Sequence, residues 1–425
     1  MTDTIFALSS GSPPAAIAVV RVSGPHAGDA MRILAGHLPE PRRAGTCDLI
    51  DTDGEVIDRA LVLWLPGPRT VTGEDVAEFH LHGGRAVVSG LEQVLETMPG
   101  LRRADPGEFT RRAFANGRID LAEAEGLADL LSAETELQRR SAQAMAGGAF
   151  SRQVEAWRGS LLDLSAGLEA ALDFADEDDV ALLPANFAQK RDALHREIAG
   201  WLARPRAEKL REGYRVVIAG PPNAGKSTLF NALIEDDAAI ATPIPGTTRD
   251  VLTRPVALEG IPFLFADTAG LHDFVDDEVE AIGIERALEA LDRADLVLWL
   301  GPEGQGPQGS WDIASQIDRA GIEPRPNARH NVSAVTFAGM DALRQDLVTA
   351  ARGSMPRPGD VALNQRQHQL LTRAAHVLGE AGHERDPLLI GENLRVGRVA
   401  FDALLGRTTT EDMLDALFGR FCIGK

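Results

Sequence analysis

At 425 residues the chain is long enough for two or three domains, and 44% hydrophobic content is ordinary for globular proteins. A formal net charge of −20 argues against electrostatic binding of nucleic acid or of an anionic membrane over a broad surface. The two cysteines, Cys47 and Cys422, exclude a disulfide framework and favour a reducing cytosol. The N-terminus has neither a basic segment nor a long apolar run, so we expect a cytoplasmic protein without signal peptide or membrane span.

Residues 1–118 have the mixed pattern of an α/β domain. Runs rich in β-branched residues predict strands at Ala15–Val22 and Ala60–Leu65, each followed by a Gly/Pro turn. The pair His80 and His82 suggests a metal site, but no cysteine or carboxylate lies at a familiar ligand spacing. We therefore favour hydrogen-bonded histidines in a turn.

From residue 119 the character changes to helix, because apolar residues recur every three or four positions and alanine is abundant. Helical patterns cover residues 120–131, 134–145, 150–174 and 187–210, and they return at 363–379, 392–405 and 410–418. We expect the two helical halves to pack together, with the intervening residues looped out between them.

A phosphate-binding motif lies in that intervening segment. Gly220–Ser227 fits G-x-x-x-x-G-K-[ST], with a predicted strand before it at Tyr214–Ala219 and a predicted helix after it at Thr228–Ile234. Lys226 supplies a cation to the outer phosphates, the Ser227 hydroxyl is placed to hold Mg²⁺, and the helix N-terminus favours negative charge. The motif predicts a nucleoside triphosphate site.

Two further motifs indicate a GTPase. Thr248, within the segment Ile244–Asp250, is suitably placed to reach Mg²⁺ and the terminal phosphate, as in a switch loop. In Asp267–Gly270, the Asp267 carboxylate could bind Mg²⁺ through water and the Gly270 N–H could donate to the γ-phosphate. The three motifs in this order resemble the translation-factor class of GTPases.

The residue after the last of these motifs departs from the Ras pattern. Leu271 occupies the position of the water-orienting Gln, and an apolar side chain cannot polarise water. The carboxylates of residues 276–285 are the candidates for that role, although most of them would be solvated in a turn that opens a helix.

The whole chain resembles the MnmE family of tRNA-modification GTPases, also called TrmE. Besides the GTPase motifs, four segments carry the resemblance: Val20–Pro25, Thr72–Glu78 with His82–Gly84, Pro106–Glu125 and Phe421–Lys425. The resemblance implies an α/β multidomain fold. It has an N-terminal α/β folate-binding and dimerisation domain (1–118) and an all-α domain in two halves (119–210 and 356–425). A Ras-like P-loop GTPase domain (211–355) interrupts the all-α domain.

The family resemblance also implies an activity and its partners. Members act as homodimers with an FAD-containing subunit, MnmG or GidA, in a heterotetramer. Together they place an aminomethyl or carboxymethylaminomethyl group on C5 of the wobble uridine of certain tRNAs, using a one-carbon tetrahydrofolate. The folate would be 5-formyltetrahydrofolate or methylenetetrahydrofolate, and the partner subunit would carry much of the tRNA-binding surface of this acidic protein.

Motif by motif, the resemblance assigns a folate site. Arg21, Glu78 and Arg118 match the family's folate contacts, with Arg at position 118 where most relatives have Lys. Cys422 matches the family's C-terminal cysteine, whose chemical role the sequence does not settle. Lys425 is the last residue of the same segment, Phe421–Lys425, which we call the C-terminal box. A buried, inert cysteine is the alternative for Cys422.

For the GTPase, the resemblance implies that K⁺ takes the place of an arginine finger when two GTPase domains meet. Asn223 matches the side-chain ligand of K⁺, Thr242, Ile244 and Thr247 fall in the K⁺ loop, and Glu280 matches the residue that orients the attacking water. The remaining expected nucleotide contacts are Ala224, Gly225, Thr228, Pro243, Pro245, Gly246, Thr268, Ala269, Ser333 and Ala334.

The base-reading end departs from the pattern of this class. No Asn-Lys-x-Asp motif is present, and the best remnant is the segment Asn327–His330, ahead of the expected base loop Asn331–Ala334. We therefore expect weaker discrimination of GTP from ATP, or a compensating contact.

Two other functions compete with the leading interpretation. One is a regulatory GTPase of ribosome assembly, which the lack of a basic RNA-binding tail and the C-terminal box disfavour. The other is a folate-dependent one-carbon transferase with a vestigial GTPase, which the degraded base motif favours and the intact phosphate motif disfavours.

Overall fold

The computed structural model describes residues 3–173, 183–235, 253–267 and 291–425. The chain forms two compact units. Unit 1 combines residues 1–128 with residues 402–425, and unit 2 spans residues 129–401. The domain boundaries expected from the sequence, at 118/119, 210/211 and 355/356, remain predictions.

Unit 1 is built on a six-stranded sheet in the order β3-β4-β5-β2-β1-β6. Neighbouring strands are antiparallel except β1 and β6, which are parallel. The strands are β1 Thr4–Leu8, β2 Ile17–Ser23, β3 Ala44–Ile50, β4 Val56–Leu65, β5 Val76–His82 and β6 Leu101–Arg103. The predicted strands at Ala15–Val22 and Ala60–Leu65 are confirmed as β2 and the second half of β4.

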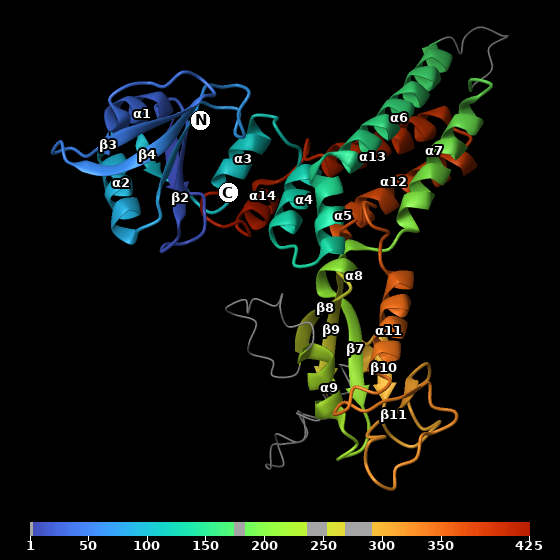
Figure 1. The fold of residues 1–425 in the computed structure, drawn as a ribbon. Helices are drawn as coiled ribbons and strands as arrows, with labels where there is room; N and C mark the ends of the chain where they lie inside the picture. Colours follow the sequence, from blue (N-terminus) through green and yellow to red (C-terminus); the bar gives the residue numbers. More distant parts are fainter. Residues whose placement is uncertain (1–2, 174–182, 236–252, 268–290) are drawn as a thin grey trace, which may run out of the picture. The chain divides into compact units, whose positions relative to one another are not determined.

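Alternation along the strands divides the sheet of unit 1 into two faces. Ala18, Val20 and Val22 of β2 are fully buried in the main core, which α1 and α2 close. Near β1, α3 covers part of the other face through Phe109. The helices of unit 1 are α1 Ala27–Ala35, α2 Arg85–Thr97, α3 Glu108–Ala115, most of α4 Leu121–Leu131, and α14 Glu411–Phe418 (Figure 1).

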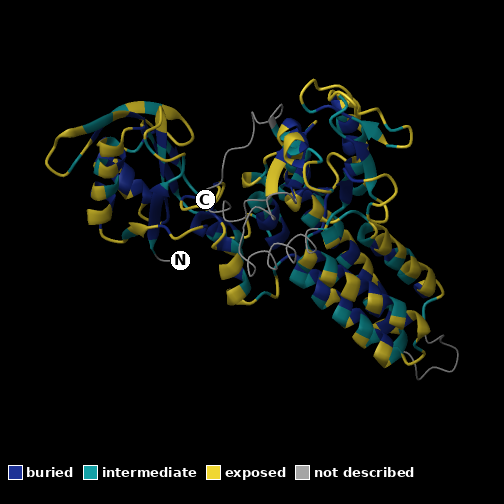
Figure 2. Cartoon of the chain, turned by 90° about the horizontal axis from the view of Figure 1, so that it is seen from below, coloured by how far each residue is buried: buried dark blue, intermediate teal, exposed yellow. Residues whose placement is uncertain are grey.

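The helices of unit 2 join segments from both sides of the nucleotide motifs. They are α5 Glu136–Ala146, α6 Ala149–Asp173, α7 Phe187–Leu202, α8 Ala207–Glu212, α12 Gln365–His383 and α13 Pro387–Leu404, which extends past the unit boundary. α12 packs along α7 (Figure 1), and the Trp157 ring lies 6.1 Å from that of Phe401. These contacts confirm that helices from before and after the GTPase motifs pack together. The helices show buried and exposed faces, as their periodicity predicts (Figure 2).

One predicted helix is wrong in its extent. The pattern from Phe187 to Leu210 suggested a continuous helix, but α7 ends at Leu202 and α8 begins at Ala207. Pro205 lies in the break, where it has no N–H to donate and disfavours helical backbone in the residue before it. Among the helices that the structure describes, none combines the length and apolar content that crossing a membrane requires.

The sheet of unit 2 has the order β12-β11-β10-β7-β9-β8. Every adjacent pair is parallel except β8 and β9. The strands are β7 Tyr214–Ala219, β8 Thr253–Leu258, β9 Ile261–Asp267, β10 Leu296–Trp299, β11 Trp311–Ala314 and β12 His330–Asn331, with helices α9 Lys226–Glu235 and α11 Met340–Ser354. The strand order changes direction around β7, and ligands of open α/β sheets bind at the carboxyl ends of strands at such a point.

Candidate functional site

The phosphate-binding loop follows the carboxyl end of β7. The predicted strand Tyr214–Ala219 and the predicted helix are confirmed as β7 and α9, which begins at Lys226. Gly225 has φ +87°, a backbone conformation that other residues rarely adopt, and a Cβ there would also displace the end of the Gln316 side chain, whose Nε2 would lie 2.8 Å away. Strand, loop and helix therefore have the arrangement that a phosphate cradle needs.

Lys226 is held inside this cradle. Its Nζ donates to the carbonyl oxygens of Gly220 and Pro221, at 2.9 Å each, and the residue is buried. Burial lowers the pKa of Lys226, although the nearby Asp267 carboxylate opposes that shift. Two carbonyl partners are easily exchanged for phosphate oxygens, which bind an ammonium group more strongly.

The described metal-binding candidates lie around the same loop. Asp267 ends β9 and pairs in register with Ile218 of β7, so its carboxylate lies at the same edge of the sheet. Ser227 and Asn223 are exposed, and Asn223 has a left-handed backbone with φ +63°. A hydroxyl and a carboxylate are oxygen donors of the kind Mg²⁺ prefers, so these residues fit that ion. The Asn223 amide oxygen suits a larger hard cation.

Many predicted site residues lie outside the described residues. They are Thr242, Pro243, Ile244, Pro245, Gly246, Thr247, Thr248, Thr268, Ala269, Gly270 and Glu280.

At the base-reading end the structure corrects the sequence interpretation. The segment directly after β11 is Ser315-Gln316-Ile317-Asp318, which ends in an aspartate at the position that Asn-Lys-x-Asp requires. Ser315 Oγ donates to the carbonyl oxygen of Ala224 at 2.6 Å, and Gln316 Nε2 donates to that of Asn223 at 3.2 Å. These two side chains brace the phosphate loop, and Asp318 follows them.

Asp318 is held by the second base loop. Ser333 is fully buried, and its Oγ donates to Oδ1 of Asp318 at 2.6 Å. A pocket of about 50 Å³ lies beside them, lined by residues of α9 and of both loops. Its lining is Gly225, Thr228, Leu229, Ser315, Gln316, Asp318, Arg319, Val332, Ala334 and Val335. A carboxylate here could accept hydrogen bonds from N1–H and N2–H₂ of guanine.

The remnant proposed from the sequence, Asn327–His330, is wrong. His330 belongs to β12, where its Nε2 lies 3.0 Å from the Asp346 carboxylate of α11, and Arg329 contacts the same carboxylate. The segment therefore stabilises the edge of the sheet and does not line the pocket.

A second site lies within unit 1. A cavity of about 570 Å³ is lined by Arg21, Arg42, Leu65, Arg69, Thr70, Val71, Phe109, Thr110, Ala113, Arg118, Ile119, Leu127 and Lys425. Arg21 and Glu78 are cross-strand partners on β2 and β5, with Arg21 Nε donating to Glu78 Oε1 at 2.9 Å. Arg21 also lies 5.8 Å from the centre of the Phe109 ring. The cavity is of the size of small-ligand sites and combines apolar walls with cations.

The C-terminal segment is tied to this domain. Ser9 Oγ donates to the carbonyl oxygen of Gly424 at 2.9 Å, and Lys425 N donates to that of Cys422 at 3.3 Å. Gly424 has φ +92°, and a Cβ on it would lie 2.1 Å from the carbonyl oxygen of Leu8, so no other residue allows this approach. Lys425 thereby lines the cavity with Arg21 and Arg118, whereas Cys422 is exposed.

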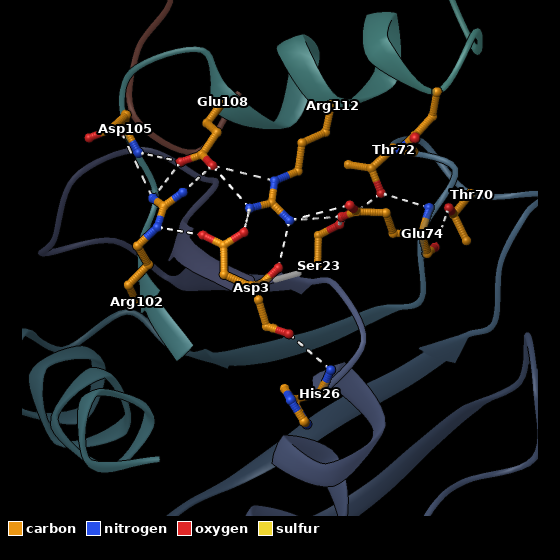
Figure 3. Close-up of polar contacts among 12 residues, drawn as sticks. Asp3, Ser23, His26, Thr70, Thr72, Glu74, Arg102, Asp105, Glu108 and Arg112 are labelled. Carbon is orange, nitrogen blue, oxygen red and sulfur yellow. Dashed lines mark hydrogen bonds and ion pairs between the residues drawn. The ribbon is translucent and has the colours of Figure 1, made fainter. Parts of the chain in front are cut away.

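Next to the cavity lining lies a buried arginine network, whose polar contacts Figure 3 shows. Arg112 of α3 is fully buried and forms ion pairs with Asp3, Glu74 and Glu108, at 3.0–3.1 Å. Ser23 Oγ donates to Glu74 at 2.8 Å. The network joins α3 to the loop at residues 70–74, and both segments line the cavity. This network could not be predicted from the sequence, because its three carboxylates come from separate parts of the chain.

The charges of this network shift its pKa values. Burial alone would raise the pKa of Glu108, but hydrogen bonds from Arg102, the Asp105 backbone and Arg112 outweigh it, and the pKa is lowered. The pKa of Asp3 is lowered against burial in the same way, chiefly by its hydrogen bond with Arg102. Both carboxylates are therefore ionised at neutral pH.

The two histidines lie in β5, not in a turn, and have acidic partners. His82 Nδ1 lies 2.8 Å from Asp58, and His80 Nε2 lies 3.4 Å from Glu78. Within residues 3–173, 183–235, 253–267 and 291–425, no three His, Cys, Asp or Glu side chains gather as a metal site would require.

Comparison with known proteins places the chain in one family. Residues 4–118 match the model of the GTP-binding protein TrmE N-terminus, and residues 121–422 match that of the MnmE helical domain. Relatives named tRNA modification GTPase MnmE are 62% identical in Novosphingobium aromaticivorans and 60% in Erythrobacter litoralis, over all of this chain and all of theirs. A third, from Rhizorhabdus wittichii, is 57% identical over all of this chain and 97% of its own. The chain therefore belongs to the MnmE family of tRNA modification GTPases.

Proposed function

We propose that this chain is the GTP-hydrolysing subunit of a cytoplasmic complex that modifies C5 of the wobble uridine of tRNA. It adds an aminomethyl or carboxymethylaminomethyl group, with 5-formyltetrahydrofolate or methylenetetrahydrofolate as the one-carbon source. An FAD-containing subunit of the MnmG (GidA) type is its partner. The observation that carries the proposal is the presence, in one MnmE-family chain, of a phosphate loop and a cation-lined cavity.

In the nucleotide site, different residues bind different parts of the nucleotide and its metal ion. Lys226 and the start of α9 bind phosphate, Asp318 binds the base, and Ser227 and Asp267 would hold Mg²⁺ together with Thr248, which lies outside the described residues. When bound, Mg²⁺ neutralises charge that develops on the phosphate oxygens during hydrolysis. Glu280 orients the attacking water, since Leu271 cannot.

Two GTPase domains meet around K⁺ in this proposal. Asn223 supplies a side-chain ligand, and Thr242, Ile244 and Thr247 supply the K⁺ loop. Support for a homodimer comes from the face of the unit 1 sheet opposite α1 and α2. Ile17, the first residue of β2, and Leu61, within β4, are 61% and 37% exposed on that face, as apolar residues of an interface would be.

Hydrolysis of GTP is therefore expected to be roughly tenfold or more faster in KCl than in NaCl at equal ionic strength, because a bound cation replaces an arginine finger. Asn223→Gly retains the left-handed backbone of this position and is expected to remove most of the difference. Equal rates of phosphate release in the two salts would contradict the K⁺-dependent mechanism.

In the cavity of unit 1, the folate would contact Arg21, Glu78, Arg118 and Lys425. A carboxylate can accept from the guanidine-like edge of a pterin, and cations bind the glutamate carboxylates of folate. Cys422, on the segment tied to this domain, is the candidate catalytic residue at the C-terminus.

The deciding experiment is mass analysis of wobble uridines from a strain that lacks this gene. We expect the C5-modified uridines to disappear and to return when the wild-type gene is restored. A gene encoding Arg21→Gln is the informative variant, since it should fail to restore them while GTP hydrolysis persists. Unchanged uridine modification in the deletion strain would refute the proposal.

A further inference from the structure

The cavity of unit 1 carries more positive charge than its neighbourhood neutralises. Five basic residues line it, namely Arg21, Arg42, Arg69, Arg118 and Lys425, in a chain whose net charge is −20. Arg21 is paired with Glu78. The other four form no ion pair with a carboxylate side chain of the described residues, although most arginines of this unit do. Such a concentration of unpaired cations marks a binding site for a polyanion.

Arg42 and Arg69 lie next to each other in the lining of the cavity. Arg42 has a left-handed backbone, with φ +63°, and its Nη2 donates to the carbonyl oxygens of Pro66 at 3.2 Å and Arg69 at 2.7 Å. These bonds fix the guanidinium beside the loop that carries Arg69 and leave its other N–H groups free for a ligand. Both residues are exposed, so an anion reaches them from solvent.

The number of cations exceeds what the simplest folate requires. A folate with one glutamate has two carboxylates, and Arg118 and Lys425 are sufficient to bind both. Arg42 and Arg69 then have no counterpart on the ligand. Each further γ-linked glutamate adds one carboxylate and lengthens the same flexible chain toward solvent.

We propose that the cavity selects folates with a γ-polyglutamyl tail, and that Arg42 and Arg69 bind the added carboxylates. The inference rests on the proposed folate function and names its substrate class. A phosphodiester backbone is the other polyanion that two arginines would bind. It is disfavoured because the arginines border a cavity with apolar walls at Leu65 and Phe109, and because the chain as a whole repels nucleic acid.

The test is equilibrium binding of 5-formyltetrahydrofolate to the full-length protein, with one or five glutamates. We expect the pentaglutamate to bind roughly tenfold tighter, because the ion pairs of Arg42 and Arg69, both exposed, each add a few-fold. The preference should shrink as salt rises, since these charges are screened. Equal affinities in the wild type overturn the inference, whereas failure of both ligands to bind overturns the folate function itself.

Substitutions test whether Arg42 and Arg69 cause the preference for the pentaglutamate. Arg42→Gln with Arg69→Gln should abolish it and leave monoglutamate affinity within about twofold. Because Arg42 also holds its loop, Arg69→Gln alone is the second variant and should remove part of the preference. Arg59→Gln, on an exposed β4 arginine outside the cavity, is the matched control and should change nothing. If the variants lose affinity for a tRNA anticodon stem-loop but keep the pentaglutamate preference, the arginines bind RNA and the inference is wrong.

Discussion

Asp318→Asn is expected to reduce the affinity for GTP by roughly a hundredfold or more, because hydrogen bonds to a charged group contribute about 1.5–3 kcal/mol each. Two donors of guanine, N1–H and N2–H₂, would lose their carboxylate acceptor. Affinity for ATP should not fall, and xanthosine triphosphate should gain, since an amide N–H matches the xanthine C2 carbonyl. Competition of the three nucleotides against a fluorescent GDP measures all of these effects.

Two further variants test whether Asp318 reads the base. Ser333→Ala removes the 2.6 Å hydrogen bond that positions Asp318, and should weaken GTP binding about fivefold. Asp346→Asn alters the side chain that contacts His330. His330 belongs to the segment that the sequence interpretation had assigned to base reading, so this variant should leave base selectivity unchanged. An unaltered ratio of GTP to ATP affinity in Asp318→Asn would show that the base is read elsewhere.

Arg112→Met is expected to destabilise unit 1 by about 3–5 kcal/mol, because removing one partner of a buried ion pair leaves uncompensated charge. Here Asp3, Glu74 and Glu108 would all lose a partner within 3.1 Å. Since the chain has two units, global unfolding is not a single transition, and hydrogen exchange of amides in β2 and α3 is the appropriate measurement.

The effect should depend on pH in a defined direction. In the wild type the lowered pKa values of Asp3 and Glu108 stabilise the fold above their ordinary values of 3.8 and 4.5, and that stabilisation is lost as pH falls through the lowered values. In the variant the pKa values of Asp3 and Glu108 are lowered less, because the Arg112 guanidinium is gone while Arg102 remains, so both carboxylates protonate at a higher pH than in the wild type. The difference between the two proteins should therefore shrink as pH falls from neutrality.

A matched control separates burial from charge. Arg43→Gln removes an arginine whose contact with Glu40 is 3.0 Å long but exposed, and it should leave hydrogen exchange unchanged. If Arg112→Met exchanges like the wild type, the network does not stabilise the wall of the cavity.

Features encoded by adjacent residues could be predicted from the sequence. The strand Tyr214–Ala219, the glycine loop and the helix from Lys226 lie within about twenty consecutive positions, and each has a strong local signal. The break at Pro205 carried a local signal too, but the continuing apolar period concealed it.

Features assembled from distant positions could not be predicted from the sequence. β11 has only four residues after a glycine-rich loop, so no periodicity marks it, and Asp318 gains meaning only once that strand is known to pair with β10. Ser315 and Gln316 replace the two side chains by which the motif is usually recognised. Whether Arg112 is buried depends on tertiary packing, which a single sequence does not reveal.

The tie between Ser9 and Gly424 has a consequence for biosynthesis. Unit 1 needs residues 402–425 to complete it, yet the remainder of the unit leaves the ribosome more than 270 positions earlier. Its sheet has to persist during translation without α14 or the segment that carries Lys425. A chain that stops early would thus hold a nucleotide site with an incomplete cavity, so only full synthesis unites the two sites in one molecule.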